Sequence, residues 1–182
     1  MTRPPIAIRK TVRDDLDRFF VYLNDHVSDN GVGGTAKFMP IPRAESGFPA
    51  EKEAAFRLGM ETPVGQSGWR RGWLALTPDG RIAGHIDLRA RMEKASAHRC
   101  LLGMGVHRDF RQQGLGAAMV AVAVAWARSE AIEWIDLEVL SVNQAARKLY
   151  QRAGFVQLGE IEDMFRIDGE SLGYAFMSLK LA

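Results

Sequence analysis

Hydrophobic and polar positions along the chain alternate between short strand-like runs and longer helical stripes. Thr11 is a candidate helix cap, and it is followed by an apolar stripe at helical spacing, namely Leu16, Phe19, Phe20 and Leu23. Further helices are predicted at residues 50–58, from Gly114 onward and at 143–153. Strands are predicted at residues 6–8, 73–76, 82–88, 100–106, 134–140, 155–158 and 174–181. This order indicates a mixed α and β fold.

Turn-forming residues separate these elements. Residues 77–80 read Thr-Pro-Asp-Gly, which suits an antiparallel hairpin between the strands on either side. Pro49 introduces one predicted helix, and Gly154 is a C-cap for another. Residues 28–47 are rich in Gly, Pro, Asn and Ser, which predicts a long loop over one domain rather than a linker between two. Long loops inside compact domains are often functional.

Composition and charge exclude several classes of protein. The 24 basic and 22 acidic residues are interspersed, so no basic tract of the kind that binds nucleic acid is present. The short pairs Arg70-Arg71 and Arg89 with Arg91 are interpreted as solvated loop or strand-end charge. The longest nearly uncharged run, residues 114–127, is shorter than the roughly 20 residues that cross a membrane as a helix.

Cysteine usage and the first residues of the chain favour a reducing compartment. Cys100 is the only cysteine, which excludes an internal disulfide and a zinc site built from cysteines. The N-terminus has neither the apolar segment nor the cleavage site of a secretory signal. A cytoplasmic protein that binds neither membrane nor nucleic acid is therefore expected.

The sequence around Gly114 carries the clearest chemical signal. A strand leads into Arg-x-x-Gly-x-Gly and then a helix, which places glycines where free helical N–H groups emerge and attract phosphate. A nucleotide P-loop would need a lysine after Gly116, and a dinucleotide fingerprint would need a third glycine and a later acidic residue. Both fit poorly. A glycine turn without a ligand stays open while these two glycines are considered alone.

Residues 106–117 closely resemble the coenzyme A-binding motif of the GNAT superfamily of N-acetyltransferases. Residues 143–155, Asn-x-x-Ala-x-x-x-Tyr followed by Gly-Phe, are similar to the second signature of that family. The resemblance is strong over residues 73–155, and it implies a coenzyme A-binding core at about 95–155. It assigns backbone N–H contacts with the pyrophosphate to Arg111, Gln112, Gln113, Gly114, Leu115, Gly116 and Ala117. It assigns contacts with the acetyl carbonyl and the pantetheine arm to Met104, Gly105 and Val106.

The resemblance also implies a fold and an activity for residues 1–182. The expected fold is a single GNAT domain with a central, mostly antiparallel, splayed sheet of six to seven strands, flanked by about four helices. The expected activity is direct transfer of an acetyl group from acetyl-CoA to a primary amine of a small molecule, without a metal and with a homodimer as an option. Two alternatives stay open: acetylation of a protein N-terminus or lysine, as in ribosomal-protein acetyltransferases, and a non-catalytic acyl-CoA sensor.

Asn143, Ala146 and Tyr150 share one face of a predicted helix, along which an elongated cofactor has room to lie. Packing against the sheet is the alternative reason for this spacing. A thioester is already activated, so an amine attacks it without a covalent enzyme intermediate. The resemblance makes Tyr150 the general acid, since a phenol of pKa about 10 protonates a thiolate whose parent acid lies near 8.5.

The general base is less defined, because Leu101 occupies the position where many relatives carry a glutamate. Candidates are His85, Asp87, Glu138 and a water relay through one of them; a structural role is the alternative for each. Nearby, Gly103 and Gly105 lie inside one predicted strand, which indicates a bulge or a close backbone approach.

The resemblance places the acceptor amine opposite the cofactor. Its expected walls are residues 28–47 and 164–169. Five apolar residues are candidates for an acceptor pocket, although packing explains them equally well: Phe38, Met39, Trp69, Trp73 and Phe165.

Overall fold

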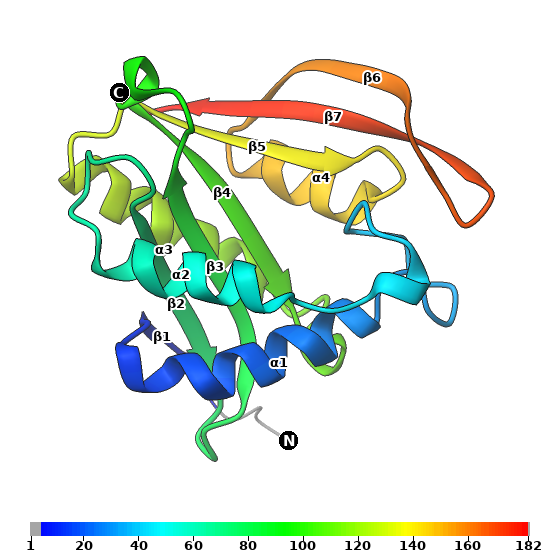
Figure 1. Ribbon diagram of the computed structural model, residues 1–182, viewed down its shortest axis with the longest axis horizontal. Coiled ribbons are helices and arrows are strands. Elements are labelled where there is room, and N and C mark those ends of the chain that lie inside the picture. Colours follow the sequence, from blue (N-terminus) through cyan, green and yellow to red (C-terminus); the bar gives the residue numbers. More distant parts are fainter. Residues whose placement is uncertain (1–4, 182) are drawn as a thin grey trace.

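The computed structural model describes residues 5–181, which form one continuous sheet with helices on both sides (Figure 1). The strands are β1 (Ala7–Lys10), β2 (Arg70–Leu76), β3 (Ile82–Ala90), β4 (Arg99–Val106), β5 (Trp134–Leu140), β6 (Val156–Ile167) and β7 (Glu170–Lys180). The helices are α1 (Leu16–Ser28), α2 (Ala50–Glu61), α3 (Leu115–Ser129) and α4 (Gln144–Arg152). Among the described residues no helix combines the length and the apolar character needed to cross a bilayer.

The sheet is splayed at its centre. Its strand order is β1-β2-β3-β4-β5-β7-β6, and every neighbouring pair is antiparallel except β4 and β5. The parallel contact runs from Arg99 opposite Trp134 to Leu101 opposite Asp136. Beyond that last pair β4 and β5 separate, as Figure 1 shows. We call this opening the wedge. The predicted fold, a mostly antiparallel splayed sheet with four helices, is confirmed.

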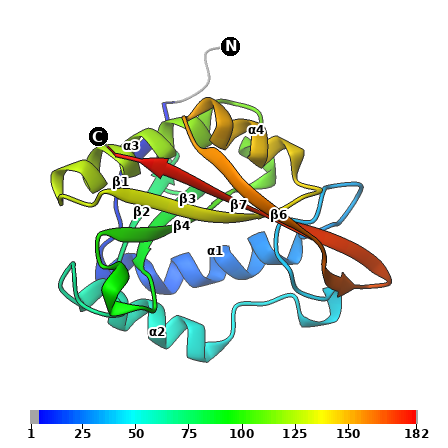
Figure 2. The same cartoon turned by 90° about the horizontal axis from the view of Figure 1, so that it is seen from above.

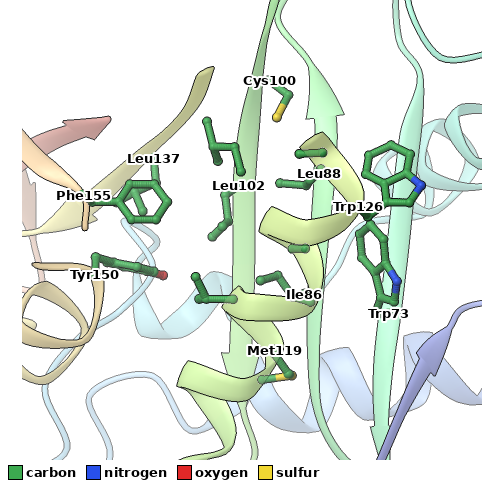
Figure 3. Close-up of a cluster of buried hydrophobic side chains, with 14 of the residues drawn as sticks. Trp73, Ile86, Leu88, Cys100, Leu102, Met119, Trp126, Leu137, Tyr150 and Phe155 are labelled. Carbon is green, nitrogen blue, oxygen red and sulfur yellow. The ribbon is translucent and has the colours of Figure 1, made fainter. Parts of the chain in front are cut away.

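Helices cover the two faces of the sheet in pairs. Helices α3 and α4 lie on one side, the α3 face, and α1 and α2 lie on the other, the α1 face (Figure 2). Because strand side chains alternate between faces, Ile86, Leu88 and Leu102 join the large core under α3, which Figure 3 shows. A second core of α1, α2 and sheet residues includes Phe19, Phe56 and Leu74. The wedge therefore opens between two separately packed layers.

Several predicted bounds are too narrow, since β2 begins at Arg70, β7 begins at Glu170 and α2 ends at Glu61, and two predictions differ more. Strand β6 continues to Ile167, whereas the sequence predicted residues 155–158 only. As an edge strand with two register shifts against β7, it carries exposed polar residues, so its hydrophobic alternation is weak. Thr11 does not cap α1. A 3₁₀ turn at Arg13–Asp15 leads into the helix, and the Asp15 carboxylate accepts a 2.9 Å hydrogen bond from the Val12 N–H.

A buried carboxylate holds the parallel contact of β4 and β5 together. Asp136 accepts hydrogen bonds of 2.8 and 2.5 Å from Arg99 and one of 3.0 Å from Arg91. The Ser178 hydroxyl donates to the same carboxylate. Burial raises the pKa of Asp136, but the hydrogen bonds from Arg99 and Ser178 outweigh burial and hold the pKa below its usual range. These contacts fix where the wedge begins.

Replacing Asp136 by Asn should lower the free energy of unfolding by about 2–3 kcal/mol, because two guanidinium groups lose their counter-charge. For a chain of this size we expect the melting temperature to fall by about 4–12 °C. Since the folded pKa is lowered, this stabilisation is present above about pH 4 and is lost as the pH falls through the folded pKa. Thermal unfolding at pH 7 and at about pH 2 measures both effects.

The matched control for this experiment is Asp163→Asn, which removes an exposed ion pair with Arg166 on edge strand β6. It should leave the melting temperature nearly unchanged, because water screens an exposed ion pair. Equal melting temperatures for the Asp136 and Asp163 variants would show that the buried contacts do not hold the strands together.

Candidate active site

The chain between β4 and α3 forms a cradle of backbone N–H groups. Gln112 and Gly114 adopt left-handed backbone angles, with φ of 60° and 79°, and α3 begins at the next residue. The first backbone hydrogen bond into the helix is donated by the Ala118 N–H to the Gly114 carbonyl. The N–H groups of residues 115–117 precede that bond and have no intrahelical acceptor, so they are available to an anion at the positive end of the helix dipole.

Gly114 and Gly116 serve this cradle in different ways. Gly114 supplies the left-handed turn, and a side chain there would meet nothing within 4 Å. At Gly116 a Cβ atom would lie 2.7 Å from Leu149 Cδ1 and 3.3 Å from Met104 Cε. Glycine at this position therefore allows α3 to start directly against β4 and α4.

Arg111 ties the cradle to the end of α1. Its Nε donates a 3.1 Å hydrogen bond to the Val106 carbonyl, and its Nη2 is paired with Asp29. The guanidinium also lies 5.8 Å from the centre of the Phe38 ring. Gln113 donates to the Asp109 carbonyl at 3.0 Å, which braces the same turn. These side chains shape the loop and leave phosphate contact to the backbone.

Helix α4 brings Tyr150 to the wedge from the α3 face. The Asn143 side chain caps this helix by accepting a 3.2 Å hydrogen bond from the Ala146 N–H. The Tyr150 ring packs 5.7 Å from that of Phe155, and its hydroxyl points toward β4 (Figure 3). Among the described residues no group hydrogen-bonds this hydroxyl. Burial raises its pKa well above the ordinary tyrosine value, so the phenol stays protonated at neutral pH.

On the α1 face, polar side chains of β3 lie over two glycines of β4. The register places His85 opposite Gly105 and Asp87 opposite Gly103. A Cβ at Gly105 would lie 2.3 Å from His26 Nε2, and one at Gly103 would lie 2.9 Å from Arg89 Nη1. Because the pairing of β3 and β4 has no register shift, these glycines mark a close approach of side chains and not a bulge.

Two neutral histidines fill the space over Gly105. His85 Nδ1 lies 3.1 Å from the Tyr22 hydroxyl, and burial lowers the pKa values of His85 and His26 to about 3. His26 stacks on Phe38 at 4.7 Å, while its Nδ1 is buried without a hydrogen-bond partner. Sequence reasoning missed His26, because α1 lies far from Gly105 in the sequence. Within residues 5–181 no three His, Cys, Asp or Glu residues are grouped to hold a metal ion.

The two carboxylate candidates for the general base differ in their surroundings. Asp87 is buried, with Arg70 at 3.5 Å and Arg89 at 3.4 Å from Oδ2. Glu138 is exposed on β5, where it alternates with the core residue Leu137 and so faces the α1 side of the wedge. Burial raises the pKa of Tyr174 to about 12, and the negative charge of Glu138 adds to that rise, which puts the two side chains close together.

The two predicted acceptor walls contact each other. Lys37 Nζ lies 3.4 Å from Asp168 and 3.2 Å from Glu170, which joins the long loop to the turn between β6 and β7. Phe165 packs 5.0 Å from the ring of Tyr174.

The tryptophan candidates for the acceptor pocket are a correction. Trp69 and Trp73 lie in the large core, 5.9 and 5.3 Å from the ring of Trp126 on α3. They are on the α3 face because strand alternation, which the residue type alone does not reveal, directs Trp73 away from α1.

The splayed sheet and the glycine-led N-terminus of α3 together form the candidate site. The sequence model of the family described as "Acetyltransferase (GNAT) family" matches residues 35–155, more than half of the chain. The chain belongs to this family.

Individual relatives agree with this assignment. The uncharacterized N-acetyltransferase YycN of Bacillus subtilis is 29% identical over 97 residues, which cover 53% of this chain and 59% of that protein. The chain thus spans only part of the length of this relative. A GNAT-family acetyltransferase from Streptococcus pneumoniae superposes with a TM-score of 0.80 at 23% identity, covering 98% of this chain and all of that one (100%).

A phosphinothricin acetyltransferase of the same superfamily from Sinorhizobium meliloti, solved in complex with AcCoA, superposes with a TM-score of 0.77. Its identity is 21%, and the match covers 97% of this chain and 89% of that chain. At these identities the structural likeness shows the fold.

Proposed function

We propose that this chain is an N-acetyltransferase that moves the acetyl group of acetyl-CoA directly to a primary amine of a small molecule. The observation that carries the proposal is the protonated Tyr150 hydroxyl, unpartnered by the described residues and directed toward the wedge next to α3. The hydroxyl keeps contact with solvent, since it is not one of the buried side-chain atoms that lack a partner among the described residues. A thiolate that leaves at the wedge is therefore able to accept its proton.

The residues divide the reaction between the two faces of the sheet. The cradle at residues 111–117 holds the pyrophosphate through backbone N–H groups, and Asn143 and Ala146 line the path of the pantetheine arm. Beyond Leu101 the edge of β4 has lost its pairing with β5, so the backbone of residues 104–106 is free to contact the acetyl carbonyl. The amine approaches from the α1 face, where the acceptor walls lie.

The chemical step requires two proton transfers. The amine nitrogen attacks the thioester carbonyl carbon, and the carbon–sulfur bond breaks as the amide forms. Glu138 takes the proton lost by the amine, and Tyr150 gives its proton to the thiolate. Glu138 is preferred over Asp87 because Glu138 is exposed toward the wedge, whereas the Asp87 carboxylate is paired with Arg70 and Arg89. His85 is a weaker candidate, since its Nδ1 is engaged by Tyr22.

Thiol release from acetyl-CoA, measured over small amines, N-terminal peptides and lysine peptides, tests the proposed function. We expect turnover with small amines, because the Lys37 ion pairs hold the two acceptor walls against each other. Turnover restricted to peptides would favour a protein acceptor. Tight coenzyme A binding without thiol release on any acceptor would favour the sensor.

Replacing Glu138 by Gln should lower kcat/KM at pH 7 by about 10- to 100-fold. General-base catalysis contributes about 10²–10⁴-fold in full. The expected loss is smaller because water reaches the exposed site and acts as a substitute base in the variant. The fold-loss in kcat/KM should become smaller above pH 9, where the amine substrate is already neutral when it binds. The pH dependence of kcat/KM between pH 6 and 10 measures this.

Asp87→Asn is the comparison variant for Glu138→Gln, with folding checked by circular dichroism. A pH-dependent loss confined to the Asp87 variant would transfer the role of base to that residue.

A further inference from the structure

Arg89 occupies a position on the α1 face that the proposed chemistry does not use. It extends from β3 across β4, so that its Nη1 atom would lie 2.9 Å from a Cβ at Gly103. Gly103 is two residues beyond Leu101, the last residue of β4 paired with β5. The guanidinium therefore lies over β4 where the wedge opens, on the side from which the proposed amine approaches.

The charge of Arg89 is only partly compensated by its neighbours. Asp87 is its hydrogen-bond partner among the described residues, at a long 3.4 Å. The same carboxylate oxygen also faces Arg70 at 3.5 Å, so two guanidinium groups share one negative charge. Arg70 lies 4.4 Å from the centre of the Phe56 ring, whereas the side chain of Arg89 is 35% exposed. Arg89 thus keeps planar N–H donors for an anion from solution.

Opposite Arg89, the far side of the wedge carries a negative charge and aromatic rings. Glu138 on β5 faces the same side of the sheet, and Tyr174 and Phe176 lie next to it on β7, opposite Leu140 and Glu138. The Arg89 guanidinium partly offsets the rise in the pKa of Tyr174 that burial and Glu138 cause, so its field reaches across the wedge. Arg89 is paired with Leu101, and Leu101 with Asp136, so Glu138 lies two residues beyond that line on β5. The two charges therefore flank the opening of the wedge on the α1 face.

We propose that the acceptor is a small amino acid-like molecule whose carboxylate binds Arg89 while its amine lies toward Glu138. Arginine binds carboxylates through two parallel hydrogen bonds. The Arg89 guanidinium and Asp87 Oδ1 both lie over Gly103, 2.9 and 3.0 Å from where its Cβ would be, and glycine leaves room for them. The inference rests on the proposed function and adds the class of acceptor. Arg89 acts here as a specificity-determining residue, and it takes no part in the proton transfers.

The test uses the full chain with acetyl-CoA and pairs of acceptors that differ only in the carboxylate. The pairs are the standard amino acids and their carboxamides. The unsubstituted protein should acetylate an amino acid at least about tenfold more efficiently than its amide. Arg89→Gln should raise KM for the acid about 10- to 100-fold, leave KM for the amide within about twofold and leave kcat unchanged. Arg89→Lys keeps the positive charge but loses the paired N–H donors of the guanidinium. Its KM for the acid should lie between those of the unsubstituted protein and Arg89→Gln.

Arg91→Gln is the matched control, because it removes the same charge from a guanidinium already paired with Asp136 and Glu93. It should keep the preference for the acid. Equal use of acids and amides by the unsubstituted protein, or an equal loss for both in Arg89→Gln, overturns the proposal and leaves the acetyltransferase activity standing.

Calorimetric titration of the amino acids into the protein with coenzyme A gives a readout that does not need turnover. Binding that Arg89→Gln abolishes supports the carboxylate site even if the acetyl group is not transferred. If the amino acids do not bind but other amines are acetylated, the carboxylate site at Arg89 is overturned and the proposed acetyltransferase function stands. Absence of thiol release on every amine tested contradicts the proposed function instead.

Discussion

Replacement of Tyr150 by Phe should lower kcat by about 10²–10³-fold and leave the affinity for coenzyme A within about twofold. General acid catalysis contributes about 10²–10⁴-fold, and a thiol with a pKa near the 8.5 of cysteine also departs in part as the unassisted thiolate. The phenylalanine ring keeps the contact with Phe155. Because no described group hydrogen-bonds the hydroxyl, its removal leaves no orphaned partner, and the protein should remain as stable as before.

Steady-state kinetics and calorimetric titration with coenzyme A separate the two effects. Tyr22→Phe is the comparison variant, since it removes another buried phenolic hydroxyl, one that lies 3.1 Å from His85 Nδ1 and 3.4 Å from the Gly105 carbonyl oxygen. It should lower the free energy of unfolding by about 1 kcal/mol and lower kcat much less than Tyr150→Phe does, because this hydroxyl is not the proton donor. An unchanged kcat in the Tyr150 variant would mean that the thiolate leaves without this proton.

Local backbone chemistry made much of the site predictable from the sequence. The turn at Gly114 requires a left-handed residue and is followed at once by a helix, and both features are visible in the order of residue types. The parallel strand at residues 134–140 is apolar enough to be delimited from its sequence, and the hairpin at residues 77–80 follows from its turn residues. Each of these signals depends on neighbours in the chain.

Contacts between distant segments were not predictable in the same way. His26 and Tyr22 reach Gly105 only because α1 packs across β3 and β4, and no periodicity in the sequence encodes that crossing. The pair Gly103 and Gly105 indicated either a bulge or a close approach. The structure decides between them, because the side chains of His26 and Arg89 occupy the space above these residues.

Arg89 shows where a visible pattern was read too simply. The sequence interpretation treated it as solvated charge. His85, Asp87 and Arg89 alternate along one strand, however, which directs all three side chains to the same face. Three polar residues on one face of a central strand are costly unless they pair or bind a ligand. The same alternation directs Trp73 into the opposite core, which the aromatic residue type alone did not reveal.

Replacement of Gly114 by Glu should weaken coenzyme A binding by at least about 100-fold while the protein remains folded. A side chain at this position meets no atom within 4 Å, so the variant has room for it, although a left-handed φ of 79° costs a non-glycine residue about 1–2 kcal/mol. The added carboxylate would compete with the pyrophosphate for the N–H groups of residues 115–117 and repel it. Like charges in such a contact cost several kcal/mol, and about 3 kcal/mol corresponds to 100-fold.

Gly114→Ala separates backbone strain from charge in the same experiment, because it adds the Cβ atom without the carboxylate. Calorimetric titration with coenzyme A should show only a few-fold loss for this variant. Raising the salt concentration should recover part of the affinity of the Glu variant, since screening weakens repulsion between exposed charges, and should not help the Ala variant. Equal affinities for the Glu and Ala variants would mean that the pyrophosphate does not bind at the N-terminus of α3. The left-handed turn at Gly114 would then serve only to start the helix against β4.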